Sequence, residues 1–334
     1  MKFEKTQSAP FNENASTKNV EVPTQHTEVL SFIKDSYKLK PEGLYMDELK
    51  WKYLIRSSVR GKNIMMVGPS GCGKTVAAQA VQKALGRPTF YFNLGATQDP
   101  RSSLIGNVHF IEGEGTVFAE ALFVKAIRTP NAIILLDELT RAHPDAWNIL
   151  MTVLDYKQRY LRIDEKDNCE TVMVADGVTF IATANIGNEY TATRQLDRAL
   201  QDRFTIIEVP VLDAVQELSL LQYIYPEVSK DLLEKIAAIA AETRNEVRTD
   251  SPKISTMMST RMSVEMAGLL YDGFSFLDAA QVAVFPFFTV EGGNDSERSF
   301  IQKVVQQYNV VDDVDGADDG DLFSSDDIKT AFSS

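Results

Sequence analysis

Four short apolar runs mark the first two thirds of the chain: Asn63–Val67, Ala132–Leu136, Gly177–Ala184 and Phe204–Val209. Runs of this length with few polar positions are typical of strands buried on both faces of a parallel sheet. After the first run, Val76–Leu85 repeats apolar residues at helical spacing. Gly86 and Pro88 follow it, and both residue types end helices. The pattern predicts an α/β fold.

The period changes after Pro210, which closes the last predicted strand. Apolar residues then recur at helical spacing in four segments: Val215–Tyr223, Lys230–Val247, Thr260–Leu270 and Phe276–Phe285. We therefore expect residues 41–211 to form an α/β domain and residues 212–308 a small all-α domain.

The two ends of the chain lack such patterns. Residues 1–40 are polar, so we expect disorder there, with at most a short helix over Val29–Tyr37. Residues 309–334 form an acidic tail, also expected to be disordered, with eight aspartates and no basic residue between Val311 and Asp327. The tail favours solubility, and its apolar residues leave a docking role open.

Two segments have the alternation and turn residues of β-hairpins. Gly106–Phe118 places two β-like runs around a Glu-Gly-Glu-Gly turn, and Arg159–Val174 places two around a polar tip. His109 and Phe110 on the first hairpin are candidates for gripping a partner. An ordinary surface hairpin is an equally good interpretation.

A complete P-loop joins the first predicted strand to the helix after it. Gly68–Thr75 reads G-P-S-G-C-G-K-T, which matches G-x-x-x-x-G-K-[ST]. Its backbone N–H groups and the helix N-terminus can cradle phosphates, Lys74 can reach the β- and γ-phosphates, and the Thr75 hydroxyl can hold Mg²⁺. The residues expected to contact the nucleotide here are Gly68, Pro69, Ser70, Gly71, Cys72, Gly73, Lys74, Thr75 and Val76.

Polar residues follow the next two predicted strands at the edge where parallel sheets bind ligands. Asp137 is placed to hold Mg²⁺ together with Thr75, and Glu138 to orient the attacking water. Asn185, at the end of the following strand, is placed to contact the γ-phosphate or its water. We therefore predict a site for ATP and Mg²⁺.

In this order, the motifs resemble those of AAA+ ATPases. Gly68–Thr75 resembles Walker A, Leu135–Glu138 Walker B and Ala182–Asn185 sensor 1. Leu196–Phe204 is similar to the segment that carries the arginine finger, and Ser259–Arg261 to sensor 2. The resemblance implies a three-layer α/β P-loop domain with a parallel sheet, followed by a small helical lid.

Three segments indicate a narrower group within these ATPases: Asp137–His143, Ala182–Gly187 and Leu200–Phe204. These resemble the MoxR-like group, which includes the CobS cobaltochelatase subunit and the CbbQ and NorQ activators. That group is similar in having a hairpin inserted before Walker B, facing the pore of a ring.

The resemblance also assigns roles to three arginines. Arg203 is the first candidate for a finger that completes the site of a neighbouring subunit, and Arg198 is the second. Either one could instead be a structural partner of a nearby aspartate. Arg261 is expected to contact the nucleotide from the lid of its own subunit. A finger acting in trans implies a homo-oligomer, and the family implies a hexameric ring.

Charge bears on the choice of partner. The chain of 334 residues has a formal net charge of −13, which disfavours nucleic acid as a partner without excluding it. The partner is therefore expected to be a protein, and the resemblance to the MoxR-like group makes a von Willebrand-type or chelatase-like subunit an option.

Location and further metals follow from composition. Cys72 and Cys169 are the two cysteines; because Cys72 lies in the P-loop, both are expected to be free thiols in a reducing compartment. The N-terminus lacks the apolar core of a signal peptide, and no apolar run could span a membrane, so we expect a cytoplasmic protein.

No metal-ligand cluster is evident, and His143 is expected to start a helix.

These observations predict a ring-forming ATPase that remodels a partner protein. Three alternatives remain at this stage: the motor subunit of a cobalt or magnesium chelatase, a nucleic-acid motor such as a helicase or loader, and a nucleotide-dependent scaffold with little turnover. The combination of Glu138, Asn185 and the arginines disfavours the scaffold.

Overall fold

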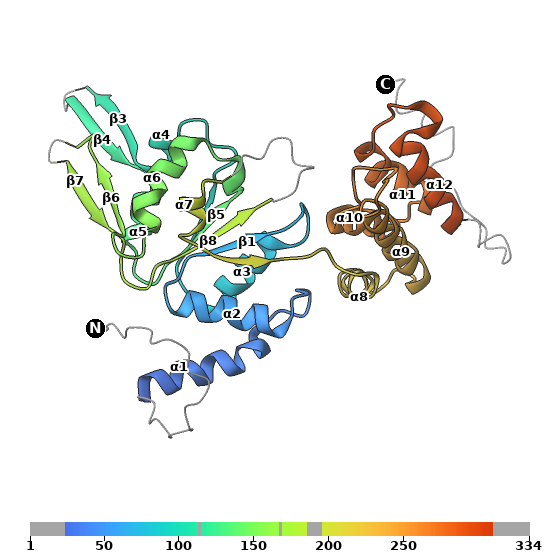
Figure 1. The fold of residues 1–334 in the computed structure, drawn as a ribbon, viewed down its shortest axis with the longest axis horizontal. Coiled ribbons are helices and arrows are strands. Elements are labelled where there is room, and N and C mark those ends of the chain that lie inside the picture. Colours follow the sequence, from blue (N-terminus) through green and yellow to red (C-terminus); the bar gives the residue numbers. More distant parts are fainter. Residues whose placement is uncertain (1–23, 113–114, 167–168, 186–195, 310–334) are drawn as a thin grey trace.

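The structure is a computed structural model that describes residues 24–112, 115–166, 169–185 and 196–309 (Figure 1). An α/β domain holds the N-terminal two thirds of the described chain, and a separate group of helices follows it. The disorder expected for residues 1–23 and for the acidic tail falls outside the described residues.

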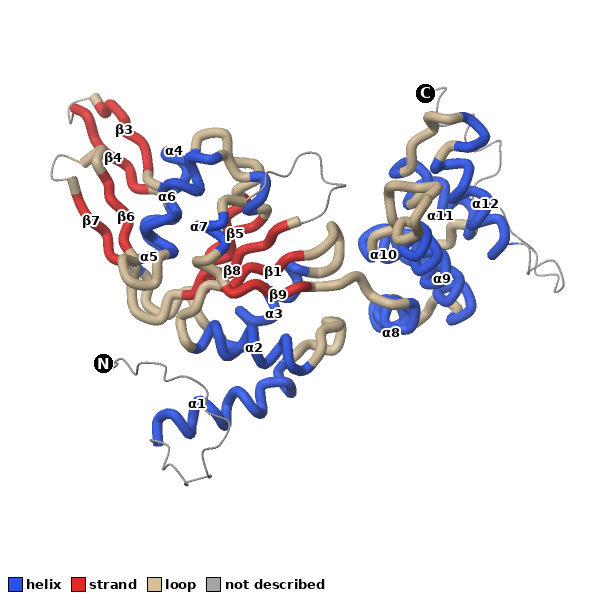
Figure 2. The backbone as a smooth tube through the Cα atoms, viewed as in Figure 1, coloured by secondary structure: helices blue, strands red, loops and turns tan. Residues whose placement is uncertain are grey.

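The α/β domain is built on one five-stranded sheet in the order β2-β5-β8-β1-β9 (Figure 2). Every pairing in this sheet is parallel. The strands are β1 (Ile64–Val67), β2 (Thr89–Asn93), β5 (Ile133–Asp137), β8 (Thr179–Ala184) and β9 (Thr205–Glu208). The parallel sheet predicted from the four apolar runs is confirmed, and β2 is an additional edge strand.

Alternate residues of the central strands enter two different cores. Ile64 and Met66 of β1 pack into one, and Met65 and Val67 into the other. Helices cover both faces of the sheet, which gives the expected three layers. The helices of this domain are α2 (Glu48–Val59), α3 (Lys74–Leu85), α4 (Pro100–Leu104), α5 (Leu122–Arg128), α6 (Pro144–Leu154) and α7 (Arg198–Gln201).

Both predicted hairpins are present. β3 (Gly106–Ile111) pairs with β4 (Gly115–Glu120), and β6 (Tyr160–Ile163) pairs with β7 (Glu170–Met173), each antiparallel. The two hairpins are joined by ion pairs among Glu120, Arg128, Lys166 and Glu170. They therefore stand beside each other as one projection of the α/β domain (Figure 1).

The C-terminal helices pack around a hydrophobic core of their own. They are α8 (Ala214–Ile224), α9 (Lys230–Glu246), α10 (Thr260–Tyr271), α11 (Phe276–Ala283) and α12 (Glu297–Asn309). The four predicted helices are confirmed with small shifts at their ends, and α12 is an additional fifth. A linker over residues 209–213 joins this lid domain to β9.

The N-terminal region contains more structure than its composition predicts. Helix α1 covers Thr24–Asp35, and a 3-10 turn covers Ser36–Leu39, where we expected disorder or a shorter helix. The buried Trp51 of α2 donates its indole N–H to the Ser36 carbonyl at 2.7 Å, which fixes the turn to the α/β domain. None of the helices in the described part of the chain is long and apolar enough to cross a membrane.

Candidate nucleotide-binding site

The P-loop lies between β1 and α3 with its lysine turned inward. Lys74 is 8% exposed, and its ammonium donates to the carbonyls of Gly68 at 2.9 Å and Pro69 at 2.6 Å. Burial lowers the pKa of Lys74, and the charge of Arg261 lowers it further, whereas Cys72 and Asp137 raise it. A positive charge so poorly hydrated interacts strongly with a phosphate that enters the loop.

The other P-loop side chains show a range of exposure. Cys72 is buried, which raises the pKa of its thiol, and both Cys72 and Cys169 are free as predicted. Ser70 and Val76 are exposed, so neither is enclosed by protein.

Three hydroxyl groups hold the carboxylate of Asp137 at the end of β5. Thr75 Oγ1 donates to Oδ1 at 3.2 Å, Tyr91 donates to Oδ2 at 2.9 Å, and the Thr183 hydroxyl donates to Oδ1. Thr75 and Asp137 thus offer two hard oxygen donors side by side, the kind of ligand that Mg²⁺ prefers. The pair predicted to hold Mg²⁺ is brought together, and its chemistry fits that ion.

Glu138, the next residue, has an unusual backbone conformation. Its φ of 56° and ψ of 41° lie in the left-handed region, which non-glycine residues seldom adopt outside turns and functional sites. Its carboxylate is 3.4 Å from the Arg141 guanidinium and packs against the backbone at Gly95. The carboxylate is thus held between Arg141 and the backbone at Gly95.

Two threonines join the ends of β5 and β8. The Thr183 hydroxyl accepts the backbone N–H of Glu138 at 3.0 Å while it donates to Asp137. The Thr140 hydroxyl accepts the backbone N–H of Asn185 at 3.4 Å. The strand ends that carry Asp137, Glu138 and Asn185 are therefore fixed to each other. Our sequence interpretation missed Thr140, Thr183 and Tyr91, although Thr183 lies within the sensor 1 motif.

The lid reaches the P-loop through the start of α10. A Cβ atom on Gly71 would lie 2.9 Å from Cβ of Ser259 and 3.8 Å from Cβ of Arg261. Gly71 also has a φ of 75°, so a larger residue would be both strained and obstructed. Arg261 is exposed, and its charge acts on Lys74, so it lies on the side of the lid that faces the P-loop.

Arg203 lies at the N-terminal ends of the sheet strands, whereas the P-loop lies at their C-terminal ends. It precedes β9, whose Thr205 pairs with Ile64 at the start of β1, whereas the P-loop follows the end of β1. Its guanidinium donates to the carbonyls of Met151 and Ala199 and lies 3.5 Å from Asp155. Arg203 therefore has structural partners in its own subunit and faces away from its own nucleotide site.

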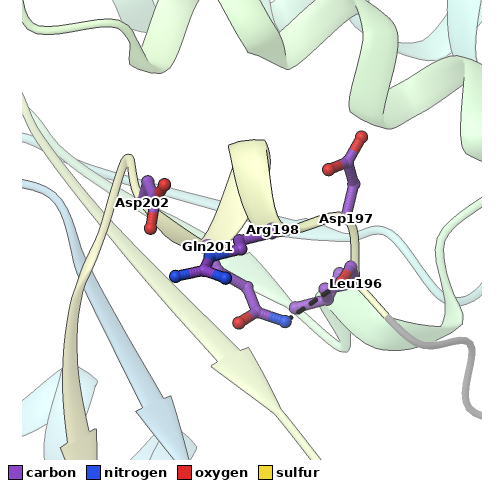
Figure 3. A pocket seen from close by; sticks show the side chains of 5 residues that line it. All are labelled: Leu196, Asp197, Arg198, Gln201 and Asp202. Atoms are coloured by element: carbon purple, nitrogen blue, oxygen red, sulfur yellow. Dashed lines mark hydrogen bonds between the residues drawn. The ribbon is translucent and has the colours of Figure 1, made fainter.

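Arg198 is more accessible. It lines a pocket of about 760 Å³ together with Leu196, Asp197, Gln201 and Asp202 (Figure 3). Asp197 accepts the backbone N–H of Ala199 at 2.8 Å and so caps α7, and Gln201 donates to the Leu196 carbonyl at 3.0 Å. These contacts fix the local backbone and leave Arg198 exposed at the surface.

The remaining candidates are on the surface or structural. Phe110 is 79% exposed on β3, and His109 beside it is also exposed. His143 caps α6 by accepting the backbone N–H of Asp145 at 3.3 Å, as expected for a helix start. Among the residues that the structure describes, His, Cys, Asp and Glu form no cluster of three or more suited to a metal ion.

Comparison with protein families matches two adjacent parts of the chain. Residues 63–204 match the AAA domain of the dynein-related subfamily. Residues 220–307 match the CbbQ/NirQ/NorQ C-terminal domain. The residues between the two matches form β9, the linker and the start of α8.

Several bacterial proteins are similar over much of the chain. BssE of Thauera aromatica, whose name describes it as a chaperone candidate, is 29% identical over 65% of this chain and 72% of its own length. An uncharacterised protein of Staphylococcus saprophyticus is 32% identical over 46% of this chain, which spans 57% of that relative. One from Staphylococcus aureus is 31% identical over 48% of this chain and 62% of its own. The two family matches, together with the fold, identify residues 63–204 as a dynein-related AAA domain and residues 220–307 as a CbbQ/NirQ/NorQ-type C-terminal domain.

Proposed function

We propose that the protein hydrolyses ATP with Mg²⁺ in a homo-oligomeric ring and uses the resulting motion to remodel a partner protein. The observation that carries the proposal is the convergence of Lys74, Thr75 and Asp137 at one edge of the sheet, with Arg198 and Arg203 away from that site. Because Arg198 and Arg203 do not reach the site of their own subunit, we infer that one of them completes the site of a neighbour. A hexamer is the ring that the family resemblance implies.

The residues divide the reaction between them. Lys74 and the P-loop amides hold the phosphates, and Arg261 adds a positive charge from the lid. Thr75 and Asp137 would hold Mg²⁺, which would supply positive charge beside the phosphates when bound. Glu138 orients the attacking water, Asn185 assists at the γ-phosphate, and an arginine of the neighbouring subunit stabilises the transition state.

The paired hairpins are the proposed contact with the client. Phe110 and Val108 are 79% and 50% exposed on β3, and the ion pair between Glu120 and Lys166 fixes the base of this hairpin to the second one. Exposed apolar side chains of this kind suit contact with polypeptide. The chaperone name of BssE supports a protein client.

ATPase measurements with two variants test the enzymatic part. Lys74→Ala is expected to lose nucleotide binding, and Glu138→Gln to bind ATP without hydrolysing it, because phosphate binding and water orientation belong to different groups. Near-wild-type turnover by Glu138→Gln would show that the catalytic assignment is wrong. Glu138→Gln is also the trap with which to isolate the client from the native host.

Titration of unfolded protein, DNA and RNA against ATPase rate tests the choice of client. We expect stimulation by protein, lost in Phe110→Ala while basal hydrolysis remains. The matched control is Tyr156→Ala, which removes an aromatic side chain that is 78% exposed outside the hairpins. Several-fold stimulation by nucleic acid that survives Phe110→Ala would instead favour a helicase or loader.

A further inference from the structure

The lid contains a fully buried ion pair that the reaction described above does not use. Arg244 of α9 and Glu217 of α8 are 2% and 0% exposed. Arg244 Nη1 is 3.0 Å from Glu217 Oε2, and Nη2 is 3.1 Å from Oε1, a bidentate arrangement. The Thr260 hydroxyl at the start of α10 donates to Glu217 Oε2 at 3.0 Å. Three lid helices therefore meet at this pair.

The guanidinium also binds two segments outside these helices. Nε donates to the Met258 carbonyl at 3.0 Å, and Nη1 donates to the Leu212 carbonyl at 2.8 Å. Nη2 completes the set with a contact of 3.4 Å to the Thr260 hydroxyl. All five N–H donors of Arg244 thus have an acceptor, one at Nε and two at each terminal nitrogen.

The positions of these acceptors matter more than their number. Leu212 belongs to the linker that joins the lid to the α/β domain, and Met258 and Thr260 flank the N-cap of α10, Ser259. Ser259 is the lid residue that packs on Gly71 of the P-loop, and Arg261 follows Thr260. The ion pair therefore joins the hinge of the lid to the backbone that carries Arg261.

Stability alone does not explain a buried ion pair. Apolar side chains of similar volume often stabilise a core equally well, because the desolvation of two buried charges offsets much of their mutual attraction. A buried bidentate pair does fix the geometry of the backbone groups that it binds. In this lid it fixes the approach of α10 to the P-loop.

We propose that Glu217 and Arg244 are positioning residues that set the angle of the lid at Leu212 and so hold Arg261 against the nucleotide. The inference rests on the ATP binding of the proposed function and on no property of the client. It predicts that removing the pair weakens ATP binding through Arg261 without unfolding the lid.

The test is the double variant Glu217→Leu/Arg244→Met, which leaves no unpaired charge. It should unfold within a few degrees of the wild type without nucleotide and bind a fluorescent ATP analogue roughly tenfold more weakly, as expected for one lost charge-assisted contact to phosphate. Adding Arg261→Ala should weaken binding no further, because both changes remove the same contact.

The matched control is Lys235→Met. Lys235 is another nearly buried cation of α9, and its ion pair with Asp231, at 3.1 Å, stays within that helix. The Lys235→Met variant should bind the ATP analogue with the affinity of the wild type. Wild-type affinity of a folded double variant for the analogue would overturn the proposal. So would a triple variant whose loss in binding free energy equals the sum of the losses in the double variant and in Arg261→Ala.

If the double variant fails to fold, Thr260→Val decides the matter, because it keeps the ion pair and removes only the hydroxyl that joins it to α10. Weaker analogue binding by folded Thr260→Val would support the proposal, and unchanged binding would assign the network to stability alone. A wild-type protein that does not bind the analogue would end both this inference and the proposed function.

Discussion

The hydroxyl of Tyr91 donates a hydrogen bond of 2.9 Å to Oδ2 of Asp137, so an edge-strand residue supports the proposed metal ligand. Burial, this hydrogen bond, and the charges of Asp137 and Glu138 raise the pKa of Tyr91 to about 12. The hydroxyl therefore keeps its proton at neutral pH and acts as a donor throughout the range in which enzymes are assayed.

Tyr91→Phe should raise the Mg²⁺ concentration needed for half-maximal ATPase activity several-fold. The ring remains, but Asp137 loses one of the groups that orient it. Binding of a fluorescent ATP analogue without Mg²⁺ should stay the same, which separates this effect from damage to the P-loop. An unchanged Mg²⁺ requirement would show that Thr75 and Thr183 suffice to position Asp137.

Tyr91 also shows where sequence reasoning reached its limit. The strand ends that carry the P-loop, Asp137 and Asn185 could be predicted because continuous apolar runs precede them. Strand β2 alternates between exposed and half-buried residues at the sheet edge, and no such run marks it. Its neighbour, β5, lies more than forty residues further along the chain, so the contact depends on the strand order.

The same limit applies to the lid. Its helices could be predicted from local periodicity, but the pairing of Glu217 with Arg244 depends on how α8 packs against α9. The Arg203 contacts to Met151 and Asp155 likewise join the segment that follows α7 to the end of α6. Spacing along the sequence carries no information about either contact.

Thr183→Val should lower both stability and hydrolysis. Valine preserves the shape of the side chain but leaves the backbone N–H of Glu138 without its acceptor and Asp137 without one donor. The loss in free energy of unfolding should be about 1–3 kcal/mol, the cost of an unsatisfied buried polar group. Denaturant unfolding measures it, and Thr183→Ser, which keeps the hydroxyl, serves as the control. Equal losses in both variants would contradict a role for the hydroxyl.

Gly95→Ala should lower kcat and leave KM for ATP nearly unchanged. The added Cβ would lie 2.4 Å from Oε2 of Glu138, so the carboxylate must move. Oε2 is the mobile end of a side chain, and the next atoms, Cβ of Glu138 and Cβ of Arg141, would lie at 3.0 and 3.2 Å and need to move only slightly. We therefore expect the fold to tolerate the substitution with a small decrease in the thermal midpoint. Steady-state kinetics beside Glu138→Gln provide the measurement. A kcat equal to that of the wild type would show that Glu138 performs its role from more than one position.

Arg203→Ala and Arg198→Ala should differ in stability as well as activity. Arg203 binds the carbonyls of Met151 and Ala199, so its loss should lower the thermal midpoint, whereas exposed Arg198 should have little effect on it. The variant that removes the trans-acting finger should retain ATP binding and lose hydrolysis by roughly 10³-fold or more.

Mixed rings then establish whether that arginine acts in trans. Subunits that lack the finger keep an intact P-loop, and Lys74→Ala subunits keep an intact finger, so a mixture restores activity only at interfaces that combine the two intact parts. Activity should therefore rise from nearly zero in either pure protein to a fraction of the wild type in the mixture, with light scattering confirming ring formation in ATP and Mg²⁺. Hydrolysis by both single arginine variants at the wild-type rate, or a protein that stays monomeric at high concentration with ATP, would refute a trans-acting arginine and with it the ring.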